Sequence, residues 1–169
     1  MSSGQRLYSD PAFRTREAPY PLLAAAEEGD SALVGTLLAA GADVNLRSPE
    51  GWSPLIMAAK EGHSGLLGEL IAAGAAVNPP DVSHSALRGA AIFGREECID
   101  QLLAAGANPD APSQGGKTAL MGAAMNGHAA VVRKLVAHGA SSKTVNEFGE
   151  TALDLAKARG HAECAEALA

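Results

Sequence analysis

Two short landmarks recur along the chain at the same interval, and this recurrence constrains the fold more than any other feature. The first is an Ala-Ala pair with a glycine three residues later. The glycines are Gly29, Gly62, Gly94 and Gly127, separated by 33, 32 and 33 residues. A Gly-Ala dipeptide at Gly41, Gly74, Gly106 and Gly139 recurs with the same steps, and a weaker fifth copy of the first landmark has Gly160. A shared fixed period predicts a stack of similar units rather than a globule.

Apolar residues between the two landmarks follow a helical spacing of i, i+1, i+4, i+5, which predicts one buried helix stripe per unit. The four stripes are Leu33, Val34, Leu37, Leu38; Leu66, Leu67, Leu70, Ile71; Cys98, Ile99, Leu102, Leu103; and Val131, Val132, Leu135, Val136. Upstream of the Ala-Ala pairs stand hydroxyl residues that we predict to be helix N-caps, namely Ser53, Ser85, Thr118 and Thr151. The glycine of each Gly-Ala dipeptide is predicted to end the second helix in a left-handed conformation. Each unit is therefore expected to run helix, turn, helix, loop.

The segment from Gly51-Trp52-Ser53-Pro54-Leu55 through Gly62-His63 to Gly74-Ala75-Ala76-Val77-Asn78 resembles one ankyrin repeat, and Gly41-Ala42-Asp43-Val44-Asn45 repeats its ending. The resemblance covers about residues 18–169. It implies an all-α solenoid of stacked helix-turn-helix units with protruding hairpin-like loops. We expect an N-terminal arm over residues 1–17, followed by repeats at approximately 18–50, 51–82, 83–115, 116–148 and 149–169. The first and last repeats should be irregular because each faces water on one side.

The chain departs from the family pattern at the position after the Pro-Leu pair, where the family usually has His. This chain has Leu23, Ile56, Arg88, Met121 and Asp154 there. We therefore expect the histidine hydrogen-bond ladder between neighbouring repeats to be weak or absent, and stability to depend on apolar stacking.

The chain shows no pattern typical of catalysis, and we predict no catalytic, cofactor-binding or metal-binding residue. His63, His128 and His161 occupy one repeat position in three different units, so we interpret them as residues that start the second helix rather than as metal ligands. Cys98 and Cys164 share a position on the apolar stripe two repeats apart, which is too far for a disulfide. We interpret both as small core residues.

The segment Gly115-Gly116-Lys117-Thr118 superficially looks like a phosphate-binding loop. That motif should follow a strand and begin with a glycine where this chain has Ala111. The repeat register gives a simpler interpretation, because Gly116 and Thr118 align with Gly149 and Thr151 as turn glycine and helix cap.

A formal charge of −6 argues against a general attraction to nucleic acid or to an anionic membrane surface. The chain also has no stretch of about 20 apolar residues, so no membrane span is expected. A small basic strip of Lys117, Arg133, Lys134 and Lys143 keeps nucleic-acid association as a less favoured alternative. Two cysteines are too few for a disulfide framework, which favours the cytoplasm or nucleus. An organelle address within residues 1–17 stays an open alternative.

The family resemblance implies that partners bind a concave surface formed by the loop tips and the exposed side of the first helix of each repeat. The position after the turn glycine holds Pro19, Trp52, His84, Lys117 and Glu150. The two residues before the helix-helix glycine are Lys60-Glu61, Ile92-Phe93 and Met125-Asn126 in the middle repeats. The predicted partner-binding residues are Trp52, Lys60, Glu61, His84, Ile92, Phe93, Lys117, Met125 and Asn126.

Four of these residues are large and apolar at positions that the repeat core does not need, namely Trp52, Ile92, Phe93 and Met125. This predicts an exposed contact patch with Trp52 as its main anchor, which loop tips near Val82 and Phe148 could extend. The alternative is that Trp52 and Phe93 cover neighbouring side chains or pack against Tyr8 and Phe13 of the arm.

The sequence therefore predicts a non-enzymatic module that binds another protein, as an adaptor, a scaffold or a subunit of a larger complex. A regulatory inhibitor that masks a partner's functional surface is the alternative, and an enzyme subunit or nucleic-acid-associated factor is less favoured. The resemblance also implies possible asparaginyl hydroxylation at Asn45 and Asn78. The simpler interpretation is that both side chains brace their own loops.

Overall fold

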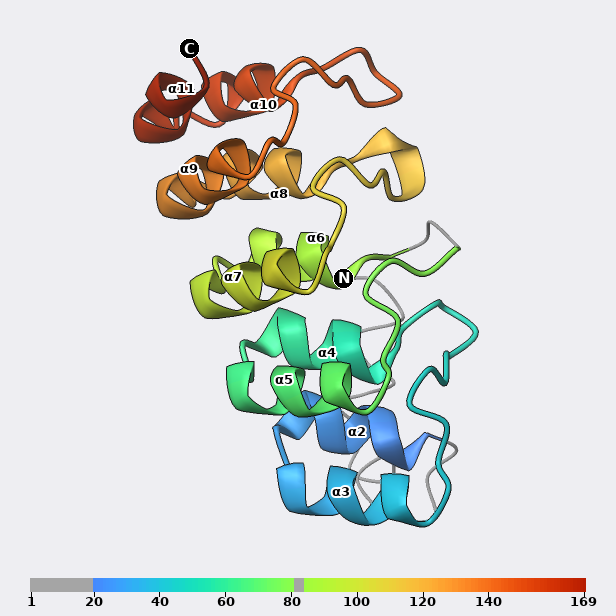
Figure 1. The fold of residues 1–169 in the computed structure, drawn as a ribbon. Helices are drawn as coiled ribbons and strands as arrows, with labels where there is room; N and C mark the ends of the chain where they lie inside the picture. The colour runs from blue at the N-terminus through green and yellow to red at the C-terminus, as the bar shows by residue number, and fades with distance from the viewer. Residues whose placement is uncertain (1–19, 81–83) are drawn as a thin grey trace.

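The computed structural model describes residues 20–80 and 84–169. These residues form five helix pairs that stack one on the next (Figure 1). The pairs are α2 (Pro21–Glu28) with α3 (Ser31–Ala39), α4 (Pro54–Glu61) with α5 (Ser64–Ala72), α6 (Ala86–Ile92) with α7 (Glu96–Ala104), α8 (Ala119–Met125) with α9 (Ala129–Ala137), and α10 (Ala152–Ala158) with α11 (Ala162–Leu168). A short 3₁₀ turn, η2 (Gln114–Gly116), lies in the loop before α8.

The first helices of the pairs form one layer and the second helices another. Helix α4 packs between α2 and α6, and α8 packs between α6 and α10, while α7 lies between α5 and α9 in the second layer. Long loops extend from one side of the stack (Figure 1). The described residues contain no strand, and their one β-bridge joins Ser113 to Lys117 at the base of a loop. The expected all-α architecture of stacked units is confirmed.

A hydroxyl residue caps the start of the first helix in four of the five pairs. The side chains of Ser53, Ser85, Thr118 and Thr151 each accept a hydrogen bond from a backbone N–H in the first turn of their helix. Thr151 also forms a full capping box, because the Asp154 carboxylate accepts from the Thr151 N–H at 2.9 Å. Hydrogen bonds from Thr151 lower the pKa of this carboxyl group. Helix α2 follows Tyr20, which provides no side-chain cap.

The core combines alanine with larger Leu, Ile and Met side chains, and the alanine pairs of the first helices are among its most buried members. In α5, Leu66, Leu67 and Leu70 are buried while Ile71 is only partly covered. The fourth stripe position is even exposed in α9, at Val136, and in α3 only Val34 of the stripe is buried. The prediction of a fully buried stripe was therefore wrong at the fourth position and in the first repeat. Cys98 and Cys164 are buried free thiols, and burial raises the pKa of both.

A polar ladder joins neighbouring repeats, at a different position from the one where we expected the histidine ladder to be weak or absent. Its donors stand directly after the helix-helix glycine rather than after the Pro-Leu pair. The ring Nε2 of His63 lies 2.8 Å from the Glu27 carbonyl oxygen in the preceding repeat. The equivalent contacts are Arg95 Nε to Lys60 O, His128 Nε2 to Ile92 O and His161 Nε2 to Met125 O. Hydrogen bonds therefore supplement apolar stacking at all four interfaces between the helix pairs.

The ladder also explains the glycine in the helix-helix turn of the first four pairs, because a side chain of the next repeat lies against each of these glycines. Gly127 has φ +78°, and a Cβ built there would lie 2.8 Å from Nδ1 of the His161 ring in the next repeat. Gly29 and Gly94 meet the rings of His63 and His128 in the same way. The backbone conformation and the next repeat's ring thus both require glycine at these turns.

Candidate partner-binding surface

Trp52 and His84, at the same position of consecutive repeats, stack on each other. Their ring centroids are 4.1 Å apart and the planes differ by 7°. Both residues are partly buried, so the Trp52 ring is not the freely exposed anchor that the sequence predicted. The stack joins the loop before α4 to the loop before α6.

Phe93 ends helix α6 and is 44% exposed. Four large hydrophobic side chains are exposed among the described residues, and Phe93 is the one at the end of a first helix. The other three lie on α9 (Val136) or in the loop before α10 (Val145 and Phe148). The Lys60 ammonium from the preceding repeat lies 5.9 Å from the centroid of the Phe93 ring. This ammonium also pairs with Glu61 at 2.8 Å, which holds the cation near the ring.

Ile92 and Met125 are partly buried, and each has a packing or backbone role. Ile92 fills the space above Gly122, where a Cβ would lie 2.9 Å from its Cγ1. The carbonyl of Met125 accepts the last bond of the inter-repeat ladder. Asn126 is exposed and donates to the Gly122 carbonyl at 2.8 Å. The expectation that all four large apolar residues are exposed was therefore wrong, since Phe93 alone is.

We call Lys60, Glu61, Ile92, Phe93, Met125 and Asn126 the Phe93 patch. The structure places these residues on three consecutive first helices or directly after them. Pro19, Tyr8, Phe13 and Val82, together with the whole arm of residues 1–17, lie outside the described residues. Phe148 is described and is 72% exposed, in the loop before α10.

The predicted basic strip is broken by acidic residues. The Lys134 ammonium donates to Asp100 at 2.6 Å and lies 3.8 Å from Glu96, both on the neighbouring helix α7. The hydrogen bond with Asp100 raises the Lys134 pKa. Lys117 lies in a loop, where its carbonyl closes the hairpin with Ser113. Because Asp100 and Glu96 compensate the positive charge of Lys134, the case for nucleic-acid binding is weaker.

Arg88 is a cation at the position after the Pro-Leu pair, where three of the other repeats have an apolar residue. Its equivalents Ile56 and Met121 are buried core residues. The Arg88 Nε is buried without a hydrogen-bond partner among the described residues, and desolvation lowers the pKa of the guanidinium. The sequence could not show that no described carboxylate pairs with Arg88, because that depends on which residues of the neighbouring repeats lie nearby.

Asn45 and Asn78 bind the next loop rather than brace their own, which corrects the simpler interpretation of their role. Asn45 donates to Gly74 O at 3.1 Å, and its carbonyl oxygen accepts from Ala76 N at 2.7 Å. Asn78 makes the same pair of contacts, with Gly106 O and Asn108 N. Asp110 continues the series by accepting from Ser141 N. Both amides lie in exposed loops with their polar atoms engaged.

The described residues contain no group of three or more His, Cys, Asp or Glu side chains able to hold a metal ion. Over the same two ranges, 20–80 and 84–169, no helix is long and apolar enough to cross a bilayer. Gly116 and Thr118 act as turn glycine and helix cap, which supports the structural interpretation of the Gly-Gly-Lys-Thr segment.

A family model described as ankyrin repeats (3 copies) matches residues 22–113 and again residues 87–169. The chain belongs to the ankyrin-repeat family. Ankyrin repeats are generally protein–protein interaction modules. No curated protein matches this ankyrin-repeat chain.

Proposed function

We propose that this ankyrin-repeat protein is an adaptor, scaffold or assembly subunit that docks a partner protein on the surface carrying the Phe93 patch and the Trp52–His84 stack. The role is non-enzymatic. Free, buried thiols at Cys98 and Cys164 favour a reducing compartment, and we place the protein in the cytoplasm or nucleus.

Exposure of Phe93 is the observation that carries the proposal. An exposed aromatic ring costs free energy in water, and the repeat does not need it for its core. The surrounding residues supply what a protein interface usually has, namely a charged rim of Lys60 and Glu61 and the polar amide of Asn126. The Trp52–His84 stack lies at the opposite end of α6 from Phe93, and aromatic residues of this kind are enriched in energetically dominant contacts.

The test compares partner capture by wild type and by Phe93→Ala, from cells that make the protein, after brief cross-linking. The protein lost with Phe93→Ala is then purified and its affinity measured with both forms. We expect Phe93→Ala to weaken binding by about fivefold or more, since truncation of a central interface aromatic costs at least about 1 kcal/mol. Val136→Ala, which removes an exposed apolar side chain on α9, is the matched control and should bind normally.

Equal affinity of wild type and Phe93→Ala for every captured protein would refute the proposal, provided that both melt at the same temperature. The purified complex also separates the two binding roles. An inhibitor would suppress the partner's own activity, whereas an adaptor would leave that activity intact while bringing in a third component.

A further inference from the structure

Three of the loops are closed at their base by the same backbone hydrogen bond. Ser48 N donates to Trp52 O, Ser113 N to Lys117 O and Asn146 N to Glu150 O, at 2.9, 2.8 and 3.0 Å. The donor residue is buried in each case. These bonds hold the incoming and outgoing arms of each loop together.

The loop between α5 and α6 cannot form this bond. The residue equivalent to Ser48, Ser113 and Asn146, four positions before His84, is Pro80, which has no N–H. This loop is also one residue shorter, because eleven positions separate Gly74 from the cap Ser85, whereas twelve separate Gly106 from Thr118. This missing residue is the reason that Gly74 and Gly106 are 32 residues apart, whereas the other steps are 33.

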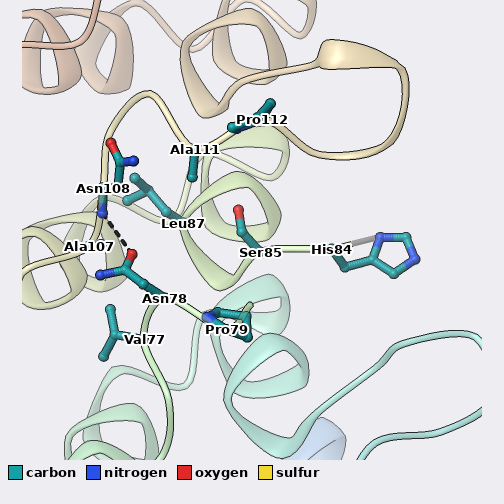
Figure 2. A pocket seen from close by; sticks show the side chains of 10 residues that line it. All are labelled: Val77, Asn78, Pro79, His84, Ser85, Leu87, Ala107, Asn108, Ala111 and Pro112. Atoms are coloured by element: carbon teal, nitrogen blue, oxygen red, sulfur yellow. Dashed lines mark hydrogen bonds between the residues drawn. The ribbon is translucent and has the colours of Figure 1, made fainter. Parts of the chain in front are cut away.

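A pocket of about 160 Å³ lies between this loop and the next one (Figure 2). Its apolar lining is formed by Val77, Pro79, Leu87, Ala107, Ala111 and Pro112. Ala111 occupies the loop position that holds Leu46 in the loop before α4, and Leu46 packs against the core there. A small residue at 111 therefore leaves open a space that a leucine side chain could fill.

Two residues that line this pocket, Asn108 and Ser85, carry hydrogen-bond donors. The carboxamide oxygen of Asn108 accepts from Asp110 N, but its Nδ2 has no partner among the described residues. Ser85 accepts from Arg88 N, which leaves its hydroxyl hydrogen to donate. Asn78, in contrast, is fully engaged with the next loop. The pocket thus combines apolar walls with donors that need acceptors.

We propose that this pocket, which we call the loop pocket, binds one aliphatic or aromatic side chain from an extended segment of a partner protein. Its volume is well below the roughly 300–1,000 Å³ of sites that enclose whole small molecules, and is close to the roughly 150 Å³ cavity that holds one benzene ring. Backbone carbonyls of the segment accept from Asn108 Nδ2 and the Ser85 hydroxyl. An extended segment fits because its carbonyls are free, whereas those of a helix are used internally.

The loop pocket is separate from the Phe93 patch. His84 is the residue that it shares with the Trp52–His84 stack, and the His84 ring points away from the other lining side chains in Figure 2. The inference rests on the proposed function only in taking the occupant to be a protein segment. Loss of one contact therefore need not remove the other.

The experiment uses the full chain and a display library of random dodecapeptides. Peptides are selected on wild type, counter-selected on Ala111→Leu, and measured with purified proteins by fluorescence anisotropy. Ala111→Leu fills the pocket with the residue that the loop before α4 carries naturally, so the variant should fold. Thr144→Leu makes the same change at the equivalent position of the loop before α10 and is the matched control.

We expect selected peptides to share one apolar position and to bind Ala111→Leu at least about tenfold more weakly than wild type, since a buried apolar side chain contributes more than about 1.4 kcal/mol. Affinity for Thr144→Leu and for Phe93→Ala should stay within about twofold of wild type. Melting temperatures of all variants are measured alongside. If no enriched peptide loses affinity for Ala111→Leu, the proposal that the loop pocket binds a partner side chain is overturned. If peptides instead lose affinity for Phe93→Ala alone, the proposed function stands and the pocket inference falls.

Discussion

Gly127 and Gly160 occupy the same position of consecutive repeats, and their replacement by alanine isolates the energy of the inter-repeat ladder. Both glycines are left-handed, with φ of +78° and +74°. A Cβ at Gly127 would lie 2.8 Å from His161 Nδ1, whereas a Cβ at Gly160 meets no atom within 4 Å. Gly160→Ala should therefore cost only the left-handed strain, about 1–2 kcal/mol. Gly127→Ala should cost this strain and also displace the ring.

The additional cost of Gly127→Ala is that of the bond between His161 Nε2 and Met125 O, which is 3.2 Å long. Such a bond contributes about 0.5–1.5 kcal/mol net, so the two variants should differ by about 1 kcal/mol. Urea unfolding followed by circular dichroism at 222 nm measures the difference, and unchanged m-values check that the same transition is compared.

A double-mutant cycle with His161→Ala tests the cause. Without the ring, Gly127→Ala should destabilise the protein by about as much as Gly160→Ala does in the wild-type background. The reasoning is refuted if the two glycine variants are equally stable from the outset, or if their difference persists after His161 is removed.

Two further predictions concern the helices. Gly35 and Gly65 lie inside α3 and α5, and a Cβ at either position meets no atom within 4 Å, so Gly35→Ala and Gly65→Ala should each stabilise the protein by about 0.5–1 kcal/mol in urea unfolding. Gly122→Ala should lose that gain because its Cβ would lie 2.9 Å from Ile92 Cγ1, and equal stabilisation by all three variants would contradict the packing argument. Asp154 has a pKa lowered by its hydrogen bonds from Thr151, so its contribution to stability is present above the unfolded-state pKa and is lost as pH falls through the folded-state value. The stability of Asp154→Asn should therefore fall less than that of wild type in thermal melts as the solution is acidified below about pH 4, and parallel pH profiles would argue against this role.

Features set within one repeat could be predicted from the sequence. Ser53 and Thr118 cap their helices because a hydroxyl just before an apolar helical run has few other local uses. Gly41 and Gly74 adopt left-handed conformations for the same kind of local reason. The one-residue deletion before α6 was also visible, although its effect on loop closure needed the geometry of the other loops for comparison.

Features that depend on two repeats were predicted less well. A donor at each of His63, Arg95, His128 and His161 was a readable signal for a ladder, but its acceptors are backbone carbonyls that carry no sequence signature. The exposure of Trp52 was overestimated because its cover is the His84 ring, 32 residues further along the chain. An aromatic pair at equal positions in neighbouring repeats is the signal that would have indicated stacking.

The inter-repeat ladder gives the stack a direction, much as a nucleic-acid strand has two different ends. Every donor reaches back to the carbonyl of the preceding repeat. In the first pair the donor position holds Asp30, whose carboxylate accepts from Leu33 N and has no proton to donate. The last pair presents Gly160 with open space beside it. A side chain from a further repeat in the same register could pack against Gly160 at the α11 end, whereas Asp30 at the α3 end already caps its own helix. The two ends of the described stack therefore differ in the contacts that they can make with another molecule.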